Sequence, residues 1–472
     1  MKSFYAYGRA AILLLATLLC SATSSATKEA IDLIVMGDYV VTMNEHSEVF
    51  RQGAVAVHDG KIIAVDTAQS ITKRYQATTQ IAGDGKILLP GLINGHTHTA
   101  MTLFRGVADD LPLMEWLTQY IFPLEAEFVT PEFVEVGAKL ACYEMIRTGT
   151  TTFVDMYFYP EVIAEVTVNC GLRAIIASPM IDYPSPGFKG WQDSHTAGVE
   201  FVKSWQNKHP RITPALAPHA PYTVAPDNLK EVGNSARELN APISIHLAET
   251  DTETQQIAKQ YDNTPVNHAL QQLGDNRIIG AHVVHPQPQD YPAMQNQRFG
   301  AIHNPSSNAK LASGIAPVTE LIEAGIAVGL GTDGAASNND LNMFEEIHLA
   351  ALLHKLQQKT PEAIPAVTAL SLATRSGAQA IGMESTVGQL IPGLAADMIQ
   401  VQTQQLAAQP VYDVISHLVY VLDGSDVVTT IVDGTVLMQD QKVLTINAER
   451  LKQEVDQLSA KIETFFQKAS DR

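Results

Sequence analysis

The 472-residue chain is predicted to be an α/β protein, a (β/α)8 barrel of the TIM type with a small accessory β-sandwich domain formed by both chain ends. Short β-type runs occupy the beginning and the end of the chain, whereas between them apolar runs alternate with longer helical stretches. The alternating part contains eight such apolar runs, the number of strands that closes a barrel. A doubly wound open sheet is the alternative, but no GxGxxG motif follows the first run.

Residues 1–26 have the pattern of a signal peptide. Lys2 and Arg9 form a weakly basic start, residues 10–19 form an apolar run too short to span a bilayer as a helix, and small residues fill positions 24–26. We therefore expect an exported, periplasmic protein with no stable membrane anchor once the signal is cleaved. An uncleaved anchor is the alternative, and a lipoprotein site at Cys20 is disfavoured because the large Leu19 precedes it.

Residues 27–88 and 388–446 are predicted to form the accessory β-domain. Its first part contains β-type runs at 32–35, 38–43, 53–58 and 61–65, with Asp59-Gly60 as a hairpin signal between the last two. Similar runs return at 398–402, 427–432 and 435–438. We expect the two sets of strands to complete one domain.

The barrel is assigned to residues 89–387, and residues 447–472 to a C-terminal surface helix with no evident site. The alternation of apolar and helical patterns predicts βα units around a parallel sheet. The eight strands are expected at 87–97, 150–156, 173–179, 212–219, 242–249, 277–285, 299–304 and 326–333.

Charge and cysteine content exclude several classes of protein. Lys and Arg number 31 against 50 Asp and Glu, a formal net charge of -19, and this acidic balance opposes binding to a nucleic-acid polymer. After the signal only Cys142 and Cys170 remain, so a disulfide scaffold is excluded. Buried free thiols are expected, with a single bridge as the alternative. The sequence leaves open whether the protein is a homo-oligomer.

The pair His96 and His98 gives the first indication of a metal site. The two histidines are two residues apart on a predicted strand, so the alternation of side chains places both imidazoles on one face, within reach of one cation. A histidine on an apolar strand is often a buried structural residue, and this pair alone does not decide between the two interpretations.

Other polar residues at strand ends favour the metal. His246 and Asp333 occur near the ends of the fifth and eighth predicted strands, and His219 and His282 near the ends of the fourth and sixth. In a closed barrel the carboxyl ends of the strands converge on one pocket. Three imidazoles and one carboxylate suit one divalent ion, zinc first, with a position left for water.

Seven short motifs lie in this part of the chain, at 90–98 (PGLINGHTH), 111–125, 219–222 (HAPY), 246–249 (HLAE), 303–305 (HNP), 332–339 (TDGAASNN) and 392–397 (PGLAAD). With these motifs the chain resembles the amidohydrolase superfamily, and within it the methylthioadenosine/S-adenosylhomocysteine deaminases and their chlorohydrolase-like relatives. The resemblance covers nearly the whole mature chain.

The resemblance implies a role for each site residue. It implies that the metal is bound by His96, His98, His246 and Asp333. Glu249 and His282, with Asp333, would then transfer protons and polarise the bound water, and Glu249 also faces the substrate. It implies substrate contacts for Glu125 and His219. Independently of the resemblance, Trp116, an aromatic residue in the stretch after the first strand, is expected to stack on a purine.

Ordinary structural interpretations stand beside these roles. Glu249 fits an exposed carboxylate at a helix start, Glu125 a solvated one, and Trp116 and Leu113 plain packing. His303 is expected to hydrogen-bond the loop after the seventh strand. One departure concerns the substrate: residues 180–195 contain Lys189 but no arginine to pair with the carboxylate of S-adenosylhomocysteine.

The function expected from the sequence is metal-dependent hydrolytic deamination of a small purine nucleoside. The substrate would be 5'-methylthioadenosine or adenosine, with S-adenosylhomocysteine as a further candidate, and the products the inosine form and ammonia. A free-base (guanine-, cytosine- or triazine-type) deaminase or chlorohydrolase of the same superfamily is the alternative, since fold alone does not exclude it. A catalytically inactive scaffold would require the ligand set to have decayed, and no ligand position has done so.

Overall fold

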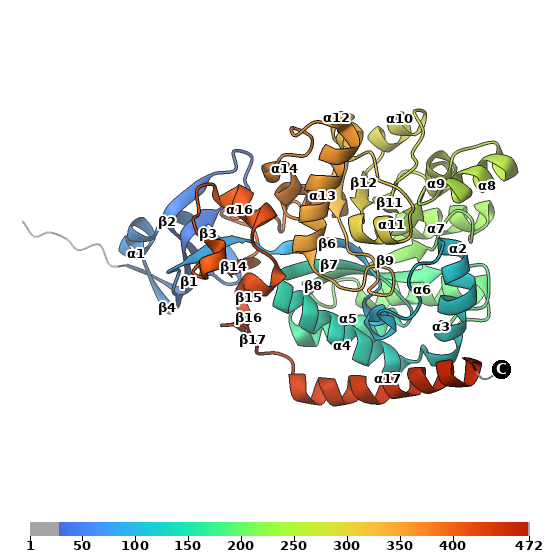
Figure 1. Cartoon of the computed structure of the whole chain (residues 1–472), viewed down its shortest axis with the longest axis horizontal. Helices are drawn as coiled ribbons and strands as arrows, with labels where there is room; N and C mark the ends of the chain where they lie inside the picture. Colours follow the sequence, from blue (N-terminus) through green and yellow to red (C-terminus); the bar gives the residue numbers. More distant parts are fainter. Residues whose placement is uncertain (1–27, 471–472) are drawn as a thin grey trace, which may run out of the picture.

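The computed structural model describes residues 28–470, with side chains for residues 28–465; the predicted signal, residues 1–26, lies outside the described residues. Figure 1 shows a β-rich lobe that contains both the first strands and the late strands, next to a larger α/β barrel. The fold class predicted from the sequence is thereby confirmed, with an accessory sheet formed by both chain ends.

Eight parallel strands form the barrel sheet, in which each strand pairs with the next in chain order from β6 to β13. The strands are β6 (Leu92–Thr97), β7 (Thr150–Met156), β8 (Arg173–Met180), β9 (Ile212–Pro218), β10 (Ile243–Leu247), β11 (Ile278–His282), β12 (Phe299–His303) and β13 (Ala327–Leu330). The number of strands and their order agree with the sequence prediction.

Polar contacts close the barrel between its first and last strands. The Asn94 side chain accepts a hydrogen bond from the Thr332 backbone N–H at 3.0 Å and donates one to the Thr332 hydroxyl at 2.7 Å. Two residues further along, the Asp333 N–H donates to the His96 carbonyl at 2.9 Å. His96 and Asp333 are therefore held side by side by the backbone itself.

The first predicted strand, residues 87–97, is wrong as a single element. The chain forms β5 (Lys86–Pro90) in the accessory sheet, then turns at Gly91 and enters the barrel as β6. At Gly91 any Cβ would lie 2.1 Å from the Thr151 hydroxyl oxygen, so only glycine fits this crossing. Pro90 and Gly91 were visible in the sequence as a break.

Helical segments follow each of the barrel strands. They are η1 (Thr99–Phe104), α2 (Leu113–Glu115), the π-helical turn η2 (Trp116–Ile121), α3 (Phe122–Phe128), α4 (Pro131–Thr148), α5 (Pro160–Cys170), α6 (Trp191–Trp205), α7 (Pro226–Leu239), α8 (Asp251–Tyr261), α9 (Pro265–Leu273), α10 (Asp290–Gln295), α11 (Pro305–Lys310), α12 (Val318–Glu323), α13 (Met343–Gln358), α14 (Ala366–Leu372) and α15 (Arg375–Ile381).

The accessory sheet contains nine strands in one continuous mixed sheet, in the order β17-β16-β15-β14-β5-β1-β2-β3, with β4 paired to β1. Its strands outside β5 are β1 (Glu29–Val41), β2 (Val49–His58), β3 (Lys61–Thr67), β4 (Tyr75–Ile81), β14 (Met398–Gln402), β15 (Val427–Val432), β16 (Thr435–Gln439) and β17 (Lys442–Val443). The helical segments α1 (Ala68–Arg74), η3 (Leu406–Ala408), α16 (Val414–Tyr420) and η4 (Gly424–Asp426) complete these regions.

A buried ion pair joins the two sheets. Arg173, at the start of β8 and 4% exposed, donates from Nε and Nη2 to the two carboxylate oxygens of Asp397 at 2.8 and 3.1 Å. The same carboxylate accepts a hydrogen bond from the Asp433 N–H at 2.7 Å. Such a bidentate pair is stronger than a single hydrogen bond, and it fixes the orientation of the two side chains relative to each other. It explains the position of Asp397 at the end of the PGLAAD motif.

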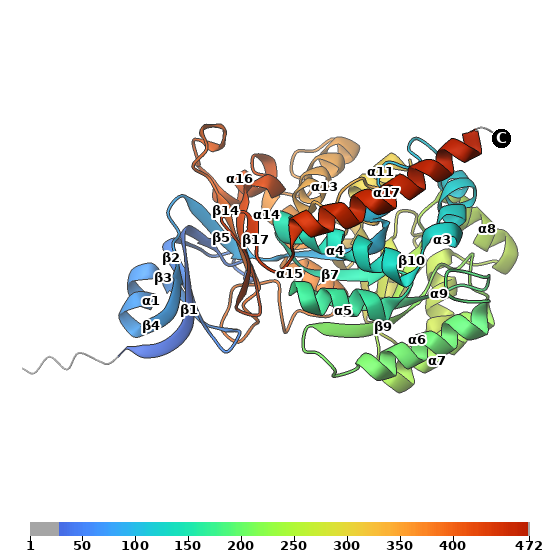
Figure 2. The same cartoon turned by 90° about the horizontal axis from the view of Figure 1, so that it is seen from below.

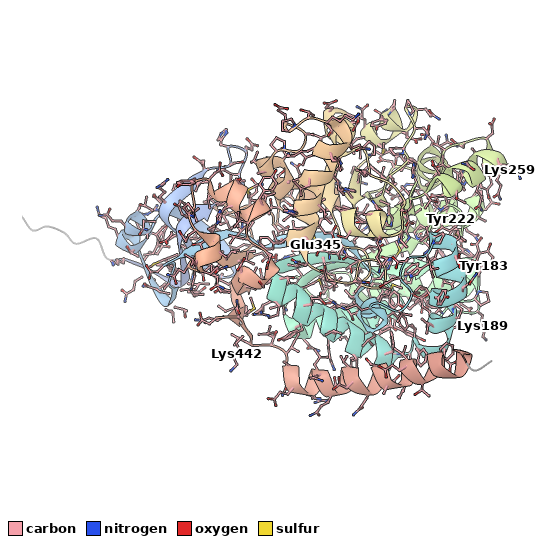
Figure 3. All side chains as sticks on the ribbon, in the orientation of Figure 1. Tyr183, Lys189, Tyr222, Lys259, Glu345 and Lys442 are labelled. Carbon is pink, nitrogen blue, oxygen red and sulfur yellow. The ribbon has the colours of Figure 1, made fainter. Side chains whose placement is uncertain are left out.

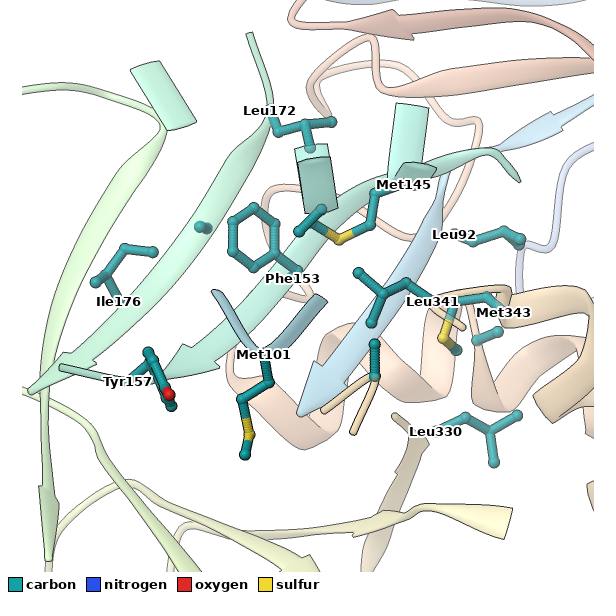
Figure 4. Packing of buried hydrophobic residues seen from close by; sticks show 14 of the residues in the cluster. Leu92, Met101, Met145, Phe153, Tyr157, Leu172, Ile176, Leu330, Leu341 and Met343 are labelled. Carbon is teal, nitrogen blue, oxygen red and sulfur yellow. The ribbon is translucent and has the colours of Figure 1, made fainter. Parts of the chain in front are cut away.

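Apolar side chains fill the space between the barrel strands and the helices. Figure 4 shows Phe153 of β7 next to Met145 of α4, with Leu172 and Ile176 close by. Cys142 of α4 and Cys170 of α5 are buried in the same layer, and both are free thiols, as expected from the sequence.

The C-terminal helix α17 (Ala448–Ser470) runs along α4 and ends near α3 (Figure 2). Leu451 and Ile462 are buried on its inner face, and the Phe465 ring meets Phe128 edge to face, 5.5 Å between centroids. Within residues 28–470, no helix combines the length and the apolar character needed to cross a membrane.

Candidate functional site

A cavity opens at the carboxyl ends of the barrel strands, where the sequence placed the site. The structure brings the predicted site residues together there. The cavity is lined by His98, Trp116, Glu125, His219, His246, Glu249, His282 and Asp333, with Leu113 beside Trp116. His96 lies beneath them with no exposed surface.

Imidazole nitrogens and one carboxylate oxygen converge at the floor of this cavity. The His98 Nε2 atom lies 3.3 Å from His246 Nε2 and 3.2 Å from Asp333 Oδ1, and His96 Nε2 lies 3.4 Å from the same oxygen. Ligand atoms of His96, His98 and Asp333 all lie within 4.8 Å of one another, as do those of His96, His246 and His282. The spacing matches donors around one central ion.

Hydrogen bonds behind the rings fix their orientation. His98 Nδ1 lies 2.5 Å from the Met156 carbonyl, and His246 Nδ1 lies 2.8 Å from the His219 carbonyl. Each Nδ1 therefore donates a hydrogen bond to a carbonyl, so that Nε2 of each ring points toward the shared point. Neither nitrogen of the buried His96 makes a hydrogen bond.

The charges of the donors also fit a cation. Burial lowers the pKa of His96 to about 4 and that of His246 well below its ordinary value, so both rings are neutral, the form that binds metal. Burial also opposes charge on His98, but the hydrogen bond and charge of Asp333 outweigh it and raise the pKa of His98 to about 9. Metal binding would release this proton.

Two serine hydroxyls hold the Asp333 carboxylate from its other side. Ser307 and Ser337 donate hydrogen bonds to Asp333 Oδ2 at 2.7 and 2.9 Å, which leaves Oδ1 directed at the histidines. Asp333 itself has a φ of 62°, a conformation that costs a non-glycine residue about 1–3 kcal/mol. His282 shares this feature, with a φ of 72°.

Glu249 lines the same cavity beside the donor cluster. It is 5% exposed, and its Oε2 lies 3.8 Å from His282 Nε2. Burial raises the pKa of the Glu249 carboxyl, opposed by the charge of His282. A carboxyl with a raised pKa in a water-poor pocket suits proton transfer, and the exposed helix-start interpretation of Glu249 is excluded by its burial.

Glu125 and His219 lie on the walls of the cavity. Glu125 is 7% exposed on α3, and burial raises its pKa to about 7, although Tyr157 and His98 favour the charged form. His219 Nδ1 lies 2.9 Å from the Thr223 hydroxyl, and burial lowers its pKa to about 3. Because it is buried, the Glu125 carboxyl is not the solvated group that the sequence left open as an alternative.

Apolar residues form the rest of the cavity wall. Trp116, 6% exposed, comes from the π-helical turn η2, and Phe158 and Ile181 follow β7 and β8. Flat aromatic and apolar surfaces of this kind suit a planar ring.

Several residues in contact with the site were not found from the sequence. Tyr157 lines the cavity, Glu253 accepts hydrogen bonds from the backbone that carries Glu249, and Asn308 contacts the ring of His282. Asn308 also lies 3.4 Å from His303 Nδ1, so His303 contacts the segment after β12, as expected. Only the short spacing from Asn304 to Asn308, one helical turn, could have indicated a shared direction.

Comparison with known proteins agrees with this geometry. Residues 87–437 match the amidohydrolase family. The chain is 42% identical over 426 residues to a 5-methylthioadenosine/S-adenosylhomocysteine deaminase of Syntrophobacter fumaroxidans, covering 90% of this chain and 97% of the relative. It is also 42% identical over 434 residues to a 5'-deoxyadenosine deaminase of Methanosarcina mazei, covering 91% and 98%.

A solved structure is similar over the same length. An adenosine deaminase of Xanthomonas campestris, crystallised with bound zinc, superposes with a TM-score of 0.90 at 35% sequence identity, covering 93% of this chain and 100% of that one. The family match includes both the barrel and part of the accessory sheet, and the chain is similar to its relatives over nearly their full length. The chain belongs to the amidohydrolase family.

Proposed function

We propose that the protein is a zinc-dependent deaminase that hydrolyses the 6-amino group of adenine nucleosides, giving the inosine form and ammonia. The observation that carries this proposal is the convergence of His96, His98, His246 and Asp333 at 3.2–3.4 Å beside the buried carboxyl of Glu249. The names of the relatives in Syntrophobacter fumaroxidans and Methanosarcina mazei support the reaction and the substrate class.

Zinc is favoured because three imidazoles and one carboxylate suit a borderline ion, and the similar Xanthomonas campestris structure contains it. When bound, the ion lowers the pKa of a coordinated water toward ~7. Glu249 then takes the proton of the attacking water and delivers a proton to the ring nitrogen next to C6. The His282 ring, whose Nε2 atom lies 3.8 Å from Glu249 Oε2, holds or accepts a proton during this exchange.

The shape of the cavity indicates which nucleosides it takes. We infer that Trp116 packs against the purine, and that Glu125 accepts hydrogen bonds from the ribose hydroxyls. Beyond the sugar, the wall consists of apolar residues that include Leu113, Phe158 and Ile181.

No lysine or arginine lines this cavity among the residues that the structure describes. The one cation of the loop after β8, Lys189, is exposed and lies at the surface with Tyr183 (Figure 3). A carboxylate on the 5' substituent would therefore be desolvated beside Glu125 and Glu249 without a partner, at a large cost. An uncharged 5' group, such as methylthio or the hydrogen of 5'-deoxyadenosine, meets an apolar wall.

A substrate panel tests this proposal. Ammonia release by the purified zinc-loaded protein is measured with 5'-methylthioadenosine, 5'-deoxyadenosine, adenosine, S-adenosylhomocysteine, adenine, guanine and cytosine. We expect the first two to give the highest kcat/KM, and S-adenosylhomocysteine to fall at least about a hundredfold below them, as an unpaired buried charge requires. Turnover of free bases without turnover of nucleosides would replace this proposal with the free-base alternative.

One further compound separates charge from size. 5'-Propylthioadenosine extends beyond the sulfur like S-adenosylhomocysteine but has no charge. We expect it to be turned over within about tenfold of 5'-methylthioadenosine. Loss of both long substrates would mean that the cavity rejects length and not charge.

We also propose that the protein is exported to the periplasm with its signal removed near Thr27. The basic start, the short apolar run and the small residues at 24–26 support this. Amino-terminal sequencing after fractionation of a Gram-negative host tests it. A soluble cytoplasmic protein that still begins with Met1 would contradict the proposal.

A further inference from the structure

His282 is held from behind by amide side chains. Its ring is 1% exposed at the end of β11, with Nε2 directed toward Glu249 and Nδ1 directed away from the cavity. The Nδ1 atom lies 2.9 Å from Asn308 Oδ1 and 3.2 Å from Asn304 Nδ2. Both asparagines are buried, Asn304 with no exposed surface and Asn308 with 1%.

Asn308 is itself oriented by two further contacts. Its backbone N–H donates to the Asn304 carbonyl at 2.9 Å within α11, and its Nδ2 group lies 3.4 Å from His303 Nδ1. An amide has one donor end and one acceptor end. With the donor end at His303, the acceptor end faces His282, so the Nδ1 atom of His282 carries a proton.

Asn304 is compatible with the same assignment. Its Oδ1 atom is buried and makes no hydrogen bond, while its Nδ2 group stands against the His282 Nδ1 atom. Turning this amide by 180° would bring its oxygen to the same N–H, and would place the Nδ2 group where Oδ1 now has no partner. The Asn308 oxygen, 2.9 Å from Nδ1, is therefore the contact that assigns the tautomer.

We propose that Asn308 is a positioning residue that keeps His282 in the tautomer with Nδ1 protonated, so that the Nε2 lone pair faces Glu249 and the reacting water. The proposal rests on the proposed deaminase function for the task of Nε2. A ring with a bare Nε2 accepts a proton at that atom, whereas the tautomer with a protonated Nε2 only donates one there.

Two substitutions at one position separate the acceptor from the rest of the side chain. Asn308→Asp keeps an oxygen opposite His282 Nδ1 and loses the donor to His303, whereas Asn308→Leu has a similar volume and neither group. We expect Asn308→Leu to lower kcat by about ten- to a thousandfold, the range of a misplaced general acid or base, with KM changed by less than about threefold. Asn308→Asp should stay within about tenfold of the wild-type kcat.

Metal content and a matched control exclude a general defect. Zinc per chain should be unchanged in both Asn308 variants, because Asn308 contacts no atom of His96, His98, His246 or Asp333 in any hydrogen bond of the structure. The control is Asn276→Leu. Asn276 is also buried, and its amide donates to the Gly233 and Leu273 carbonyls far from the site. This variant should lose thermal stability and keep its kcat.

A spectroscopic measurement tests the tautomer without turnover. In zinc-loaded protein with ¹⁵N-labelled histidine, His282, assigned by its absence in His282→Gln, should show a protonated Nδ1 and a bare Nε2. In Asn308→Leu this signature should be lost. If no nucleoside were a substrate, the proposed function would fail but this result would still stand. Equal losses of kcat in Asn308→Leu and Asn308→Asp, or a wild-type His282 protonated on Nε2 alone, would overturn the positioning role.

Discussion

The side chain of Glu253 holds the backbone of Glu249. Its Oε2 atom accepts a hydrogen bond from the Glu249 N–H at 2.8 Å, and its Oε1 atom accepts one from the Ala248 N–H at 3.0 Å. Thr250, the cap of α8, in turn accepts a hydrogen bond from the Glu253 N–H at 3.1 Å. Thr250 and Glu253 thus form a helix-capping arrangement, and this arrangement also fixes the backbone that carries the Glu249 side chain.

Glu253→Ala should therefore slow turnover through Glu249. We expect kcat to fall by about ten- to a hundredfold with bound metal unchanged, because a general acid or base depends steeply on its position. In the Glu249→Gln background the same substitution should add little, since two residues that act as a unit are not additive. Full additivity of the two losses would show that Glu253 stabilises the fold independently of Glu249.

Glu249 and His246 should fail in different ways. Glu249→Gln is expected to keep its metal while turnover drops by about two to four orders of magnitude, the contribution of a positioned acid or base. His246→Ala removes a donor atom 3.3 Å from His98 Nε2, so metal and activity should be lost together. Metal analysis by mass spectrometry beside steady-state kinetics checks both. A Glu249→Gln protein without metal would make Glu249 a ligand.

The Glu125 carboxyl should matter only for substrates with a sugar. Loss of a charge-assisted acceptor leaves ribose hydroxyls buried and unpaired, at a cost of about 1–3 kcal/mol each. Glu125→Ala should thus lower kcat/KM for 5'-methylthioadenosine by about ten- to a few thousandfold. Any slow activity on adenine serves as the control and should barely change. Equal losses on nucleoside and base would remove the sugar-binding role.

The buried Glu346 of α13 should make stability depend on pH. Its carboxylate oxygens accept hydrogen bonds from Ser306 N–H at 3.1 Å and Asn338 Nδ2 at 2.7 Å, and burial raises its pKa to about 8. Because the folded-state pKa is higher than the unfolded value near 4.5, the folded protein binds the proton more tightly. This contribution to stability is full below pH 4.5 and is lost as the pH rises to 8.

Glu346→Gln imitates the protonated side chain and should remove this dependence. The variant is expected to be more stable than the wild type at pH 8, with the difference shrinking toward pH 5 at a slope of at most about 1.4 kcal/mol per pH unit. Denaturant unfolding across this range measures the difference. Glu323→Gln, at an exposed position of α12, is the matched control and should show no such trend. A constant difference across pH would contradict the assignment.

The sequence predicted those site residues whose position follows from strand periodicity. His96 and His98 lie two apart on β6, and Asp333 follows β13, so alternation and the convergence of strand ends were sufficient. Asn308 and Glu253 were not found, because their contacts depend on how a helix start folds back onto a neighbouring strand end. Nothing in the local pattern of either residue reports that contact.

The prediction of the fold likewise succeeded for some strands and failed for others. Apolar runs separated by helical patterns predicted the eight barrel strands, because each of these strands is largely buried and is followed by a helical segment. Strand β4 was missed because it is an edge strand whose residues are mostly exposed, without an apolar alternation to report it. The single strand expected at 87–97 failed because one apolar run serves two sheets, and only the crossing at Gly91 separates them.

The closure of the barrel between Asn94 and Thr332 has a consequence for biogenesis. His96 and His98 emerge early during synthesis, whereas Asp333 emerges more than two hundred residues later, and the accessory sheet needs strands that follow even later. Contacts of such separation form only once the intervening chain is complete. A chain cut before Asp333 therefore lacks one of the four donors, and any chain cut before β14 lacks the late strands of the accessory sheet. A chain in which all four donors meet has therefore been made at least as far as Asp333, and one with a complete accessory sheet at least as far as β17.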